Sequence, residues 1–248
     1  MTDAKALEAR LDRLAEVAVK VGLGRVEGQE AVMTAPLDAV ALARRITHHA
    51  YAAGATLVTV LYSDDVATLE RFRTGHDASF DKASAWLYDG MAAAFRSGAA
   101  RLAIVGENPS LLAAEDPDRV ARANRARSTA YRPALDLIAR SAINWTIVSA
   151  ATPAWAKAVF PDLSEAEAVG RLWDAIFKAS RADGADPIAD WAAHNAALAA
   201  RTKIMNDKRF SALRFRGPGT DLEVGLPDGH RWAGGAGKAT SPAALDDP

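Results

Sequence analysis

Short apolar runs alternate with longer amphipathic segments along the first two thirds of the chain. The runs are EAVMTA (30–35), LVTVLY (57–62), RLAIVGE (101–107) and NWTIVSA (144–150). Unbroken apolar runs of this kind are typical of parallel strands that are covered on both faces. The pattern predicts strands near 31–35, 57–61, 101–106 and 144–149.

Helical periodicity fills the intervals between these runs and continues beyond the last one. The predicted helices are 4–21, 38–54, 65–73, 78–97, 117–140, 164–180 and 187–207. Asp116 followed by Pro117 is a helix-start signal, and Ser164 with Glu167 forms a capping box. Pro133 should kink or divide its helix, because proline lacks the N–H that an α-helix needs. Strands alternating with helices predict an α/β fold with a doubly wound, mostly parallel sheet.

The period changes from helical to two after Phe210. Leu213 and Phe215 alternate with polar residues, as do Leu222, Val224 and Leu226. The intervening Gly217-Pro218-Gly219 predicts a β-hairpin with a three-residue connection. We therefore expect three parts, listed here in order: an N-terminal α/β domain at 1–208, the start of a second domain at 209–237, and an irregular tail at 238–248.

Composition narrows the functional classes. The chain has 248 residues, of which 50% are hydrophobic, and its formal net charge is −1. A near-neutral chain has no field that attracts nucleic acid or an anionic membrane, so neither partner is expected. It has no cysteine, which excludes disulfides and thiolate metal sites. No signal-peptide core or long apolar span is evident, which predicts a cytoplasmic protein.

One compact group of metal-ligand residue types lies around the predicted hairpin: Asp221, Glu223, Asp228 and His230. Asp221 and Glu223 share a strand face, so their carboxylates could converge on a divalent ion. Arg214 and Arg216 should lie across the hairpin, however, and ion pairs with them are the favoured interpretation.

The other candidates are weaker. Adjacent His48 and His49 point about 100° apart on a helix and cannot easily share a metal. His76 suits a helix N-cap, and His194 suits a packed or solvated helix position. The predicted helix 117–140 is rich in arginine, and we favour a solvated or subunit-facing surface there over a phosphate-binding site. The arginines are Arg119, Arg122, Arg125, Arg127, Arg132 and Arg140. No HExxH, GxSxG or Walker A motif occurs, so the residues alone give no catalytic constellation.

The segment NWTIVSAATPAWAKAVFPDLSEAEAVGRLWDAIFKASR (144–181) resembles the thermophilic metalloaminopeptidase family, the aminopeptidase T and aminopeptidase S type. The similarity includes rare residues at matching places, such as Trp145, Pro153, Trp155 and Trp173. LAEVAVKVGL (14–23), AIVGENPSLLA (103–113) and KRFSALRFRGPGTDLEVGLPDGHRWAGG (208–235) extend the resemblance to almost the whole chain.

This resemblance implies an exopeptidase that releases N-terminal amino acids from peptides. It implies a water activated by two divalent metal ions (Co, Zn or Mg), a peptide substrate and a homodimer. The family's first metal-binding glutamate lies in a Pro-Thr-Glu-Glu-type motif after a Gly-rich turn. Here Gly234–Gly237 is followed by KATSPAALDDP, which lacks that motif; Asp246 and Asp247 do not match it. No catalytic, cofactor-binding or metal-binding residue of the family can therefore be carried onto this chain.

We expect the chain alone to be inactive and to represent the N-terminal domain with a truncated catalytic domain. A reading-frame interruption, a piece cut at a domain boundary and a natural homologue without the chemistry explain the missing motif equally well. The alternative function is a non-catalytic α/β binding or dimerisation domain derived from the same family.

Overall fold

The computed structural model describes residues 2–24 and 26–240, and these form two compact units. Unit 1 comprises the described residues up to Pro187 together with 238–240, and unit 2 comprises 188–237. In unit 1, the Thr240 N–H donates to the Ser141 carbonyl at 2.7 Å. The rest of the predicted tail, with Asp246 and Asp247, lies outside the described residues.

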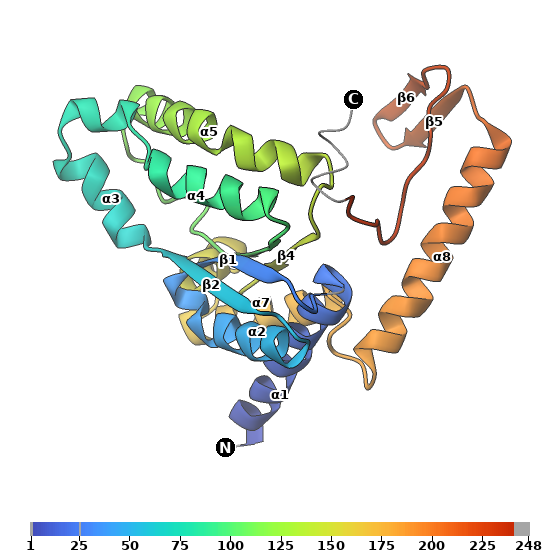
Figure 1. Cartoon of the computed structure of the whole chain (residues 1–248), viewed down its shortest axis with the longest axis horizontal. Helices are drawn as coiled ribbons and strands as arrows, with labels where there is room; N and C mark the ends of the chain where they lie inside the picture. The colour runs from blue at the N-terminus through green and yellow to red at the C-terminus, as the bar shows by residue number, and fades with distance from the viewer. Residues whose placement is uncertain (1, 25, 241–248) are drawn as a thin grey trace. The chain divides into compact units, whose positions relative to one another are not determined.

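Unit 1 is built on four parallel strands in the order β2-β1-β3-β4 (Figure 1). The strands are β1 (Glu30–Pro36), β2 (Leu57–Ser63), β3 (Ala100–Val105) and β4 (Trp145–Ser149). β1 pairs with β2 from Glu30↔Leu57 to Pro36↔Ser63, and with β3 from Ala31↔Ala100. The predicted parallel α/β sheet and its four strands are confirmed.

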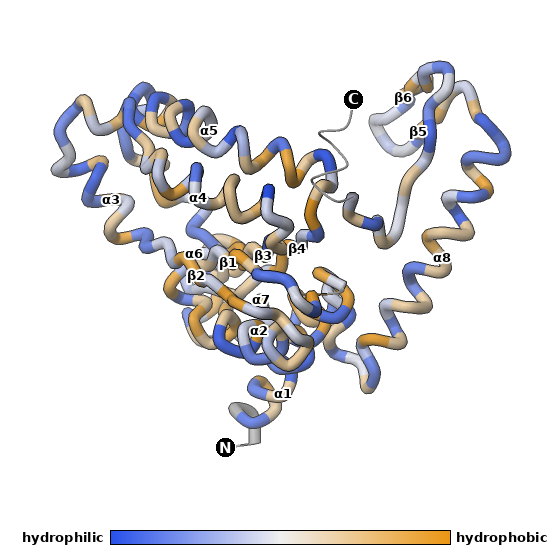
Figure 2. The backbone as a smooth tube through the Cα atoms, viewed as in Figure 1, coloured by the Kyte–Doolittle hydropathy of each residue, from blue (hydrophilic) through white to orange (hydrophobic). Residues whose placement is uncertain are grey.

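Helices cover both faces of this sheet. One face packs against α1 (Thr2–Val17), the π-helical turn Ala18–Leu23, α2 (Val40–Ala52), α6 (Pro153–Val159) and α7 (Glu165–Ala179). The other face packs against α4 (Ala85–Arg96) and α5 (Pro117–Ala139). Figure 1 shows α4 and α5 on the side of the sheet opposite α2 and α7, and Figure 2 shows the apolar residues of β1 and β2 between these layers. The sheet is therefore doubly wound, as the sequence predicts.

The central strands are buried on both faces, but the edge strands are not. Leu57 is 47% exposed and Ile147 is 49% exposed. Both side chains share the α4/α5 face with Val32, because register partners of parallel strands point the same way. The expectation of full cover is therefore wrong for β2 and β4, since neither Leu57 nor Ile147 belongs to the apolar cluster that α4 and α5 form with the sheet.

Local start signals position the helices as expected. Asp64 caps α3 (Asp65–Thr74) and Asp116 caps α5, each carboxylate accepting a backbone N–H at 2.8 Å. The Ser164–Glu167 capping box at α7 is present. Hydrogen bonds to the Glu167 carboxylate lower its pKa below the usual value; the Ser164 hydroxyl contributes most, and the Ser164 backbone N–H contributes less. A carboxyl group whose pKa is lower in the folded than in the unfolded state stabilises the fold at pH values above the unfolded-state pKa. The contribution of Glu167 is therefore lost as the pH falls through its folded-state pKa.

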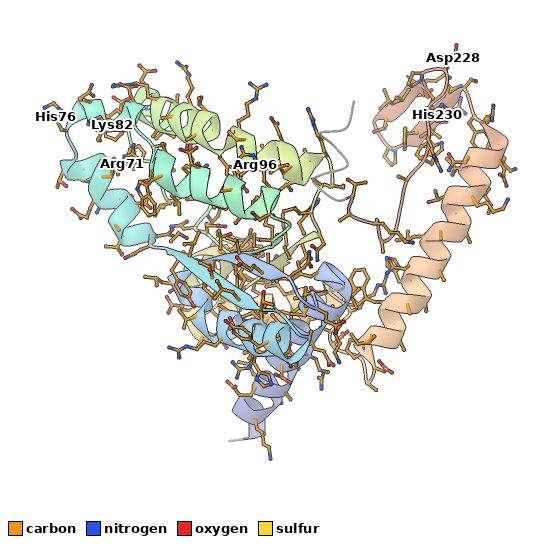
Figure 3. All side chains as sticks on the ribbon, in the orientation of Figure 1. Arg71, His76, Lys82, Arg96, Asp228 and His230 are labelled. Atoms are coloured by element: carbon orange, nitrogen blue, oxygen red, sulfur yellow. The ribbon has the colours of Figure 1, made fainter. Side chains whose placement is uncertain are left out.

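Three helix predictions need correction. The predicted helix 78–97 is a 3-10 segment, Asp77–Asp81, followed by α4. The break lies beside Arg71, whose guanidinium donates to the carbonyls of Ser79 and Lys82 (Figure 3). The Ser79 carbonyl keeps its 3-10 hydrogen bond from the Lys82 N–H, and the Lys82 carbonyl is bound by the Arg71 side chain just before α4 begins. Pro133 does not divide α5, because Ala134 and Ile138 just beyond it are anchored in the core. Helix α6 was not predicted, although Thr152 and Pro153 begin it with a cap and a proline.

Unit 2 consists of α8 (Pro187–Lys208, whose first residue belongs to unit 1) and the antiparallel hairpin β5 (Ala212–Gly217) and β6 (Thr220–Gly225). Gly217 pairs with Thr220, so the connection has two residues, Pro218 and Gly219, rather than the predicted three. Gly219 has φ +73°, which glycine adopts without strain. The segment after the hairpin returns to α8, where Asn206 exchanges hydrogen bonds with the backbone of Trp232 at 2.8 and 3.0 Å.

Gly106 is the tightest backbone position at the end of β3. A Cβ there would lie 2.5 Å from the Ala150 carbonyl oxygen and 2.9 Å from Thr152 Cγ2. We expect Gly106→Ala to lower the free energy of unfolding by about 1–3 kcal/mol, because the backbone of the neighbouring strand must move. The matched control is Gly170→Ala in the middle of α7, where a Cβ meets nothing within 4 Å.

The free energy of unfolding of the Gly170→Ala control should rise by up to ~1 kcal/mol, because alanine is a better helix former than glycine. Urea unfolding of both variants and the parent measures the difference. Equal stabilities for the two variants would show that the β3 end is not as closely packed as described.

Candidate functional site

The carboxylates on the hairpin are engaged in an ion pair. Arg214 binds both oxygens of Asp221 at 2.9 Å, and the Arg216 Nε lies 3.6 Å from Asp221 Oδ1. The hydrogen bonds from Arg214 lower the pKa of Asp221, and the nearby guanidinium of Arg216 adds to this effect. The predicted cross-strand ion pairing is therefore confirmed for Asp221. A carboxylate held by two guanidinium groups is a poor ligand for a divalent ion.

Glu223 takes no part in this pairing. It stands opposite Arg214 in the register, but Arg214 reaches diagonally to Asp221 instead. Within 2–24 and 26–240, Glu223 makes no ion pair. The predicted pairing is thus wrong for Glu223, because one bidentate partner satisfies the arginine.

Asp228 and His230 line a pocket of about 540 Å³ that belongs entirely to unit 2. Both residues come from the segment that follows β6 (Figure 3). The His230 Nδ1–H donates to the Pro227 carbonyl at 2.9 Å, and the imidazole packs edge-on to Trp232 with ring centroids 6.0 Å apart. One carboxylate and one imidazole are too few for a two-metal centre. No cluster of three or more His, Asp or Glu side chains suited to a metal occurs in the described part of the chain.

The remaining histidines have local structural roles. His49 Nε2 lies 3.0 Å from Asp12 Oδ1, and its ring contacts His48 edge-on at 5.4 Å. His76 caps the 3-10 segment through the Ala78 N–H, which confirms the N-cap prediction. His194 packs against Trp191 with ring centroids 5.5 Å apart.

The arginines of α5 divide into two groups. Arg122 donates to Asp81 and Asp77, and Arg119 lies 3.5 Å from Asp77. These hydrogen bonds raise the pKa of Arg122, and the Arg122 hydrogen bond lowers that of Asp81. These two arginines tie α5 to the 3-10 segment and are not free to bind phosphate. The others, Arg125, Arg127, Arg132 and Arg140, have no ion pair within the residues described.

Arg101 was not predicted from the sequence to be a site residue, but it lies inside β3 and lines another pocket together with Arg127. A signal was available, because a single arginine inside an otherwise apolar parallel strand is unusual. None of the described helices is long and apolar enough to cross a membrane.

Comparison with known proteins connects this fold to an enzyme family. The family model described as thermophilic metalloprotease (M29) matches residues 7–244. Aminopeptidase T of Thermus aquaticus is 54% identical over 231 residues, which cover 93% of this chain and 57% of that protein. Aminopeptidase AmpS of Bacillus subtilis (strain 168) is 35% identical over 225 residues, covering 91% of this chain and 55% of that protein.

A solved structure gives the same result. Wild-type AmpT from Thermus thermophilus superimposes with a TM-score of 0.87 at 50% identity, over 92% of this chain and 56% of that one. The chain thus spans less than two thirds of the length of each of these relatives. Sequence and structure agree over nearly all of the chain, and it therefore belongs to the thermophilic metalloprotease (M29) family.

Proposed function

We propose that this chain is a part of a metal-dependent aminopeptidase, a hydrolase that releases N-terminal amino acids from peptides. The observation that carries the proposal is its 54% identity to an aminopeptidase over 93% of the chain. We further propose that the chain by itself catalyses no hydrolysis. Two divalent ions are the proposed cofactors of the complete enzyme. The cytoplasmic location expected from the sequence stays a prediction.

The described side chains do not fit a two-metal centre. Such a centre needs several carboxylate and imidazole ligands that converge on one place. Asp221 is held by two arginines, and the described residues bring no three candidate ligands together. No catalytic step is therefore assigned to residues of this chain.

The domain assignment is also a proposal: 1–208 is the N-terminal α/β domain, 209–237 begins the catalytic domain, and 238–248 is a tail. The exposed hairpin supports it. Phe215 and Leu222 are each 51% exposed and Val224 is 41% exposed, so one face of the hairpin is largely uncovered. A two-stranded hairpin is marginally stable alone, so further strands are needed to cover it.

The same exposed face favours the second candidate function, a domain that self-associates without turnover. Leu213↔Val224 and Phe215↔Leu222 are cross-strand pairs that share one face, while Arg214, Arg216 and Asp221 occupy the other. Burying such apolar side chains contributes on the order of 1 kcal/mol each for the half that is exposed. We propose that two copies of the chain pair through this face, in keeping with a homodimer.

The proposal of inactivity is tested with an aminoacyl p-nitroanilide and added Co²⁺ or Zn²⁺. We expect no hydrolysis above the metal-only background and no metal retained after desalting. Circular dichroism should show that the chain is folded in the same buffer. Metal-dependent turnover that disappears in Asp228→Asn or His230→Gln would instead place a working site in the unit 2 pocket.

The coding sequence beyond codon 248 provides an independent check. A Pro-Thr-Glu-Glu motif in any frame would support the aminopeptidase as the parent protein. Its absence in every frame would favour the non-catalytic domain.

Self-association is tested by sedimentation of Leu222→Lys/Val224→Lys beside the parent. We expect the parent to form a dimer and the double variant to be a monomer, because two lysines cannot be buried at the paired faces. Glu223→Lys is the matched control, because it adds a lysine to the opposite face of the same strand and should leave the dimer intact. A parent that is monomeric at every concentration would rule out pairing through the hairpin.

A further inference from the structure

A pocket of about 460 Å³ lies in unit 1 between the sheet and helices α4 and α5. Its walls come from five elements: β1, β2, β3, α4 and α5. They carry two arginines, Arg101 and Arg127, and three tyrosines, Tyr62, Tyr88 and Tyr131, but no Asp or Glu. We call it the arginine–tyrosine pocket. It is separate from the Asp228–His230 pocket, which belongs to unit 2.

Arg101 is the distinctive residue of this pocket. It interrupts the apolar strand β3 and shares a sheet face with Val32, on the side of α4 and α5. Its Nε is fully enclosed, yet none of the atoms in the described part of the chain accepts a hydrogen bond from it. Buried polar atoms without partners are rare in folded proteins, and each calls for an explanation.

The two cations of the pocket have no acidic partner. Across residues 2–24 and 26–240, neither Arg101 nor Arg127 makes an ion pair. Arg119 and Arg122, on the same helix as Arg127, are by contrast paired with Asp77 and Asp81. The two guanidinium groups therefore create a positive site that no carboxylate among the described residues pairs with.

The rest of the wall is aromatic, aliphatic and hydroxylic. The Tyr88 and Tyr131 rings lie 5.5 Å apart between centroids, Leu87 and Met91 add apolar surface, and Ser63 adds a hydroxyl. Tyrosine presents an apolar ring with a polar tip, which suits a ligand that has a charged end and an apolar body. The volume is in the range of small-molecule sites.

We propose that the arginine–tyrosine pocket binds a small organic carboxylate with an aromatic or branched apolar body and no cationic group. Guanidinium groups bind carboxylates through paired, charge-assisted hydrogen bonds, which would supply the Arg101 Nε with an acceptor. A ligand that carries an ammonium group would meet two cations and no carboxylate. The proposal does not rest on the aminopeptidase function, because it uses only residues of unit 1.

Calorimetric titration of the whole chain with N-acetyl-L-phenylalanine tests the proposal. We expect saturable binding with a Kd on the order of 1 mM or lower. N-acetyl-L-phenylalaninamide, which has the same body without the charge, should bind at least about tenfold more weakly, because it lacks the carboxylate. Free phenylalanine should also bind more weakly. Equal binding of the acid and the amide, no saturable binding of the acid, or tighter binding of inorganic phosphate would overturn the proposal.

Substitutions locate the binding. Arg127 is exposed on α5, so Arg127→Gln should fold normally and weaken binding of N-acetyl-L-phenylalanine by about tenfold. Arg132→Gln is the matched control, because it removes the same charge from the same helix outside the pocket, and it should leave the Kd unchanged. Equal loss of affinity in both variants would mean that general charge, not the pocket, attracts the anion.

Arg101→Met tests the enclosed guanidinium directly. It should abolish binding while the circular dichroism spectrum and unfolding midpoint stay close to those of the parent. If Arg101→Met is unstable, Arg101→Lys serves instead, because it keeps the positive charge but lacks the planar guanidinium that binds both carboxylate oxygens. It should weaken binding of N-acetyl-L-phenylalanine without changing binding of N-acetyl-L-phenylalaninamide. Unchanged affinity for the acid in a folded Arg101 variant would contradict the assignment.

Discussion

The double-sided burial of β1 and β3 is the constraint on which the rest of unit 1 depends. Ala31, Met33, Leu102 and Ile104 face one helical layer, while Val32 faces the other. A parallel pair can satisfy its backbone and its side chains only when helices cover both faces, and this requires the crossovers through α2, α4 and α5. In the described part of the chain, the apolar face of the hairpin in unit 2 is about half exposed at Phe215, Leu222 and Val224. Unit 1 thus covers its central strands on both faces, whereas the hairpin needs a partner.

The elements with strong local signals were predictable from the sequence. Apolar runs specified the four strands, and Asp116 and Ser164 marked two helix starts. The errors occur where distant residues decide the local structure. Arg71 binds the carbonyl of Lys82, 11 residues away, where the predicted helix 78–97 is interrupted, and the covering helices leave the edge strands exposed. Neither effect can be seen in the periodicity of the segment concerned.

Candidate chemistry was predictable only where partners are close in sequence. Arg214 and Asp221 are separated by 7 residues, and their pairing follows from the predicted hairpin. Arg122 meets Asp81 across 41 residues, so its structural role required the fold. The same holds for Arg101 and Arg127, which different elements bring to one pocket. Family membership was predictable because rare residues such as Trp155 and Trp173 occur in matching contexts, which physical patterns alone do not reveal.

Unit 1 should be stable by itself, whereas the hairpin should not. Amide hydrogen exchange followed by mass spectrometry, at a concentration low enough to keep the chain monomeric, tests this claim most directly. We expect the slowest exchange in β1 and β3, near the rate of global unfolding, and fast exchange in β5 and β6. A monomer in which 212–225 exchanges as slowly as 100–105 would contradict the account.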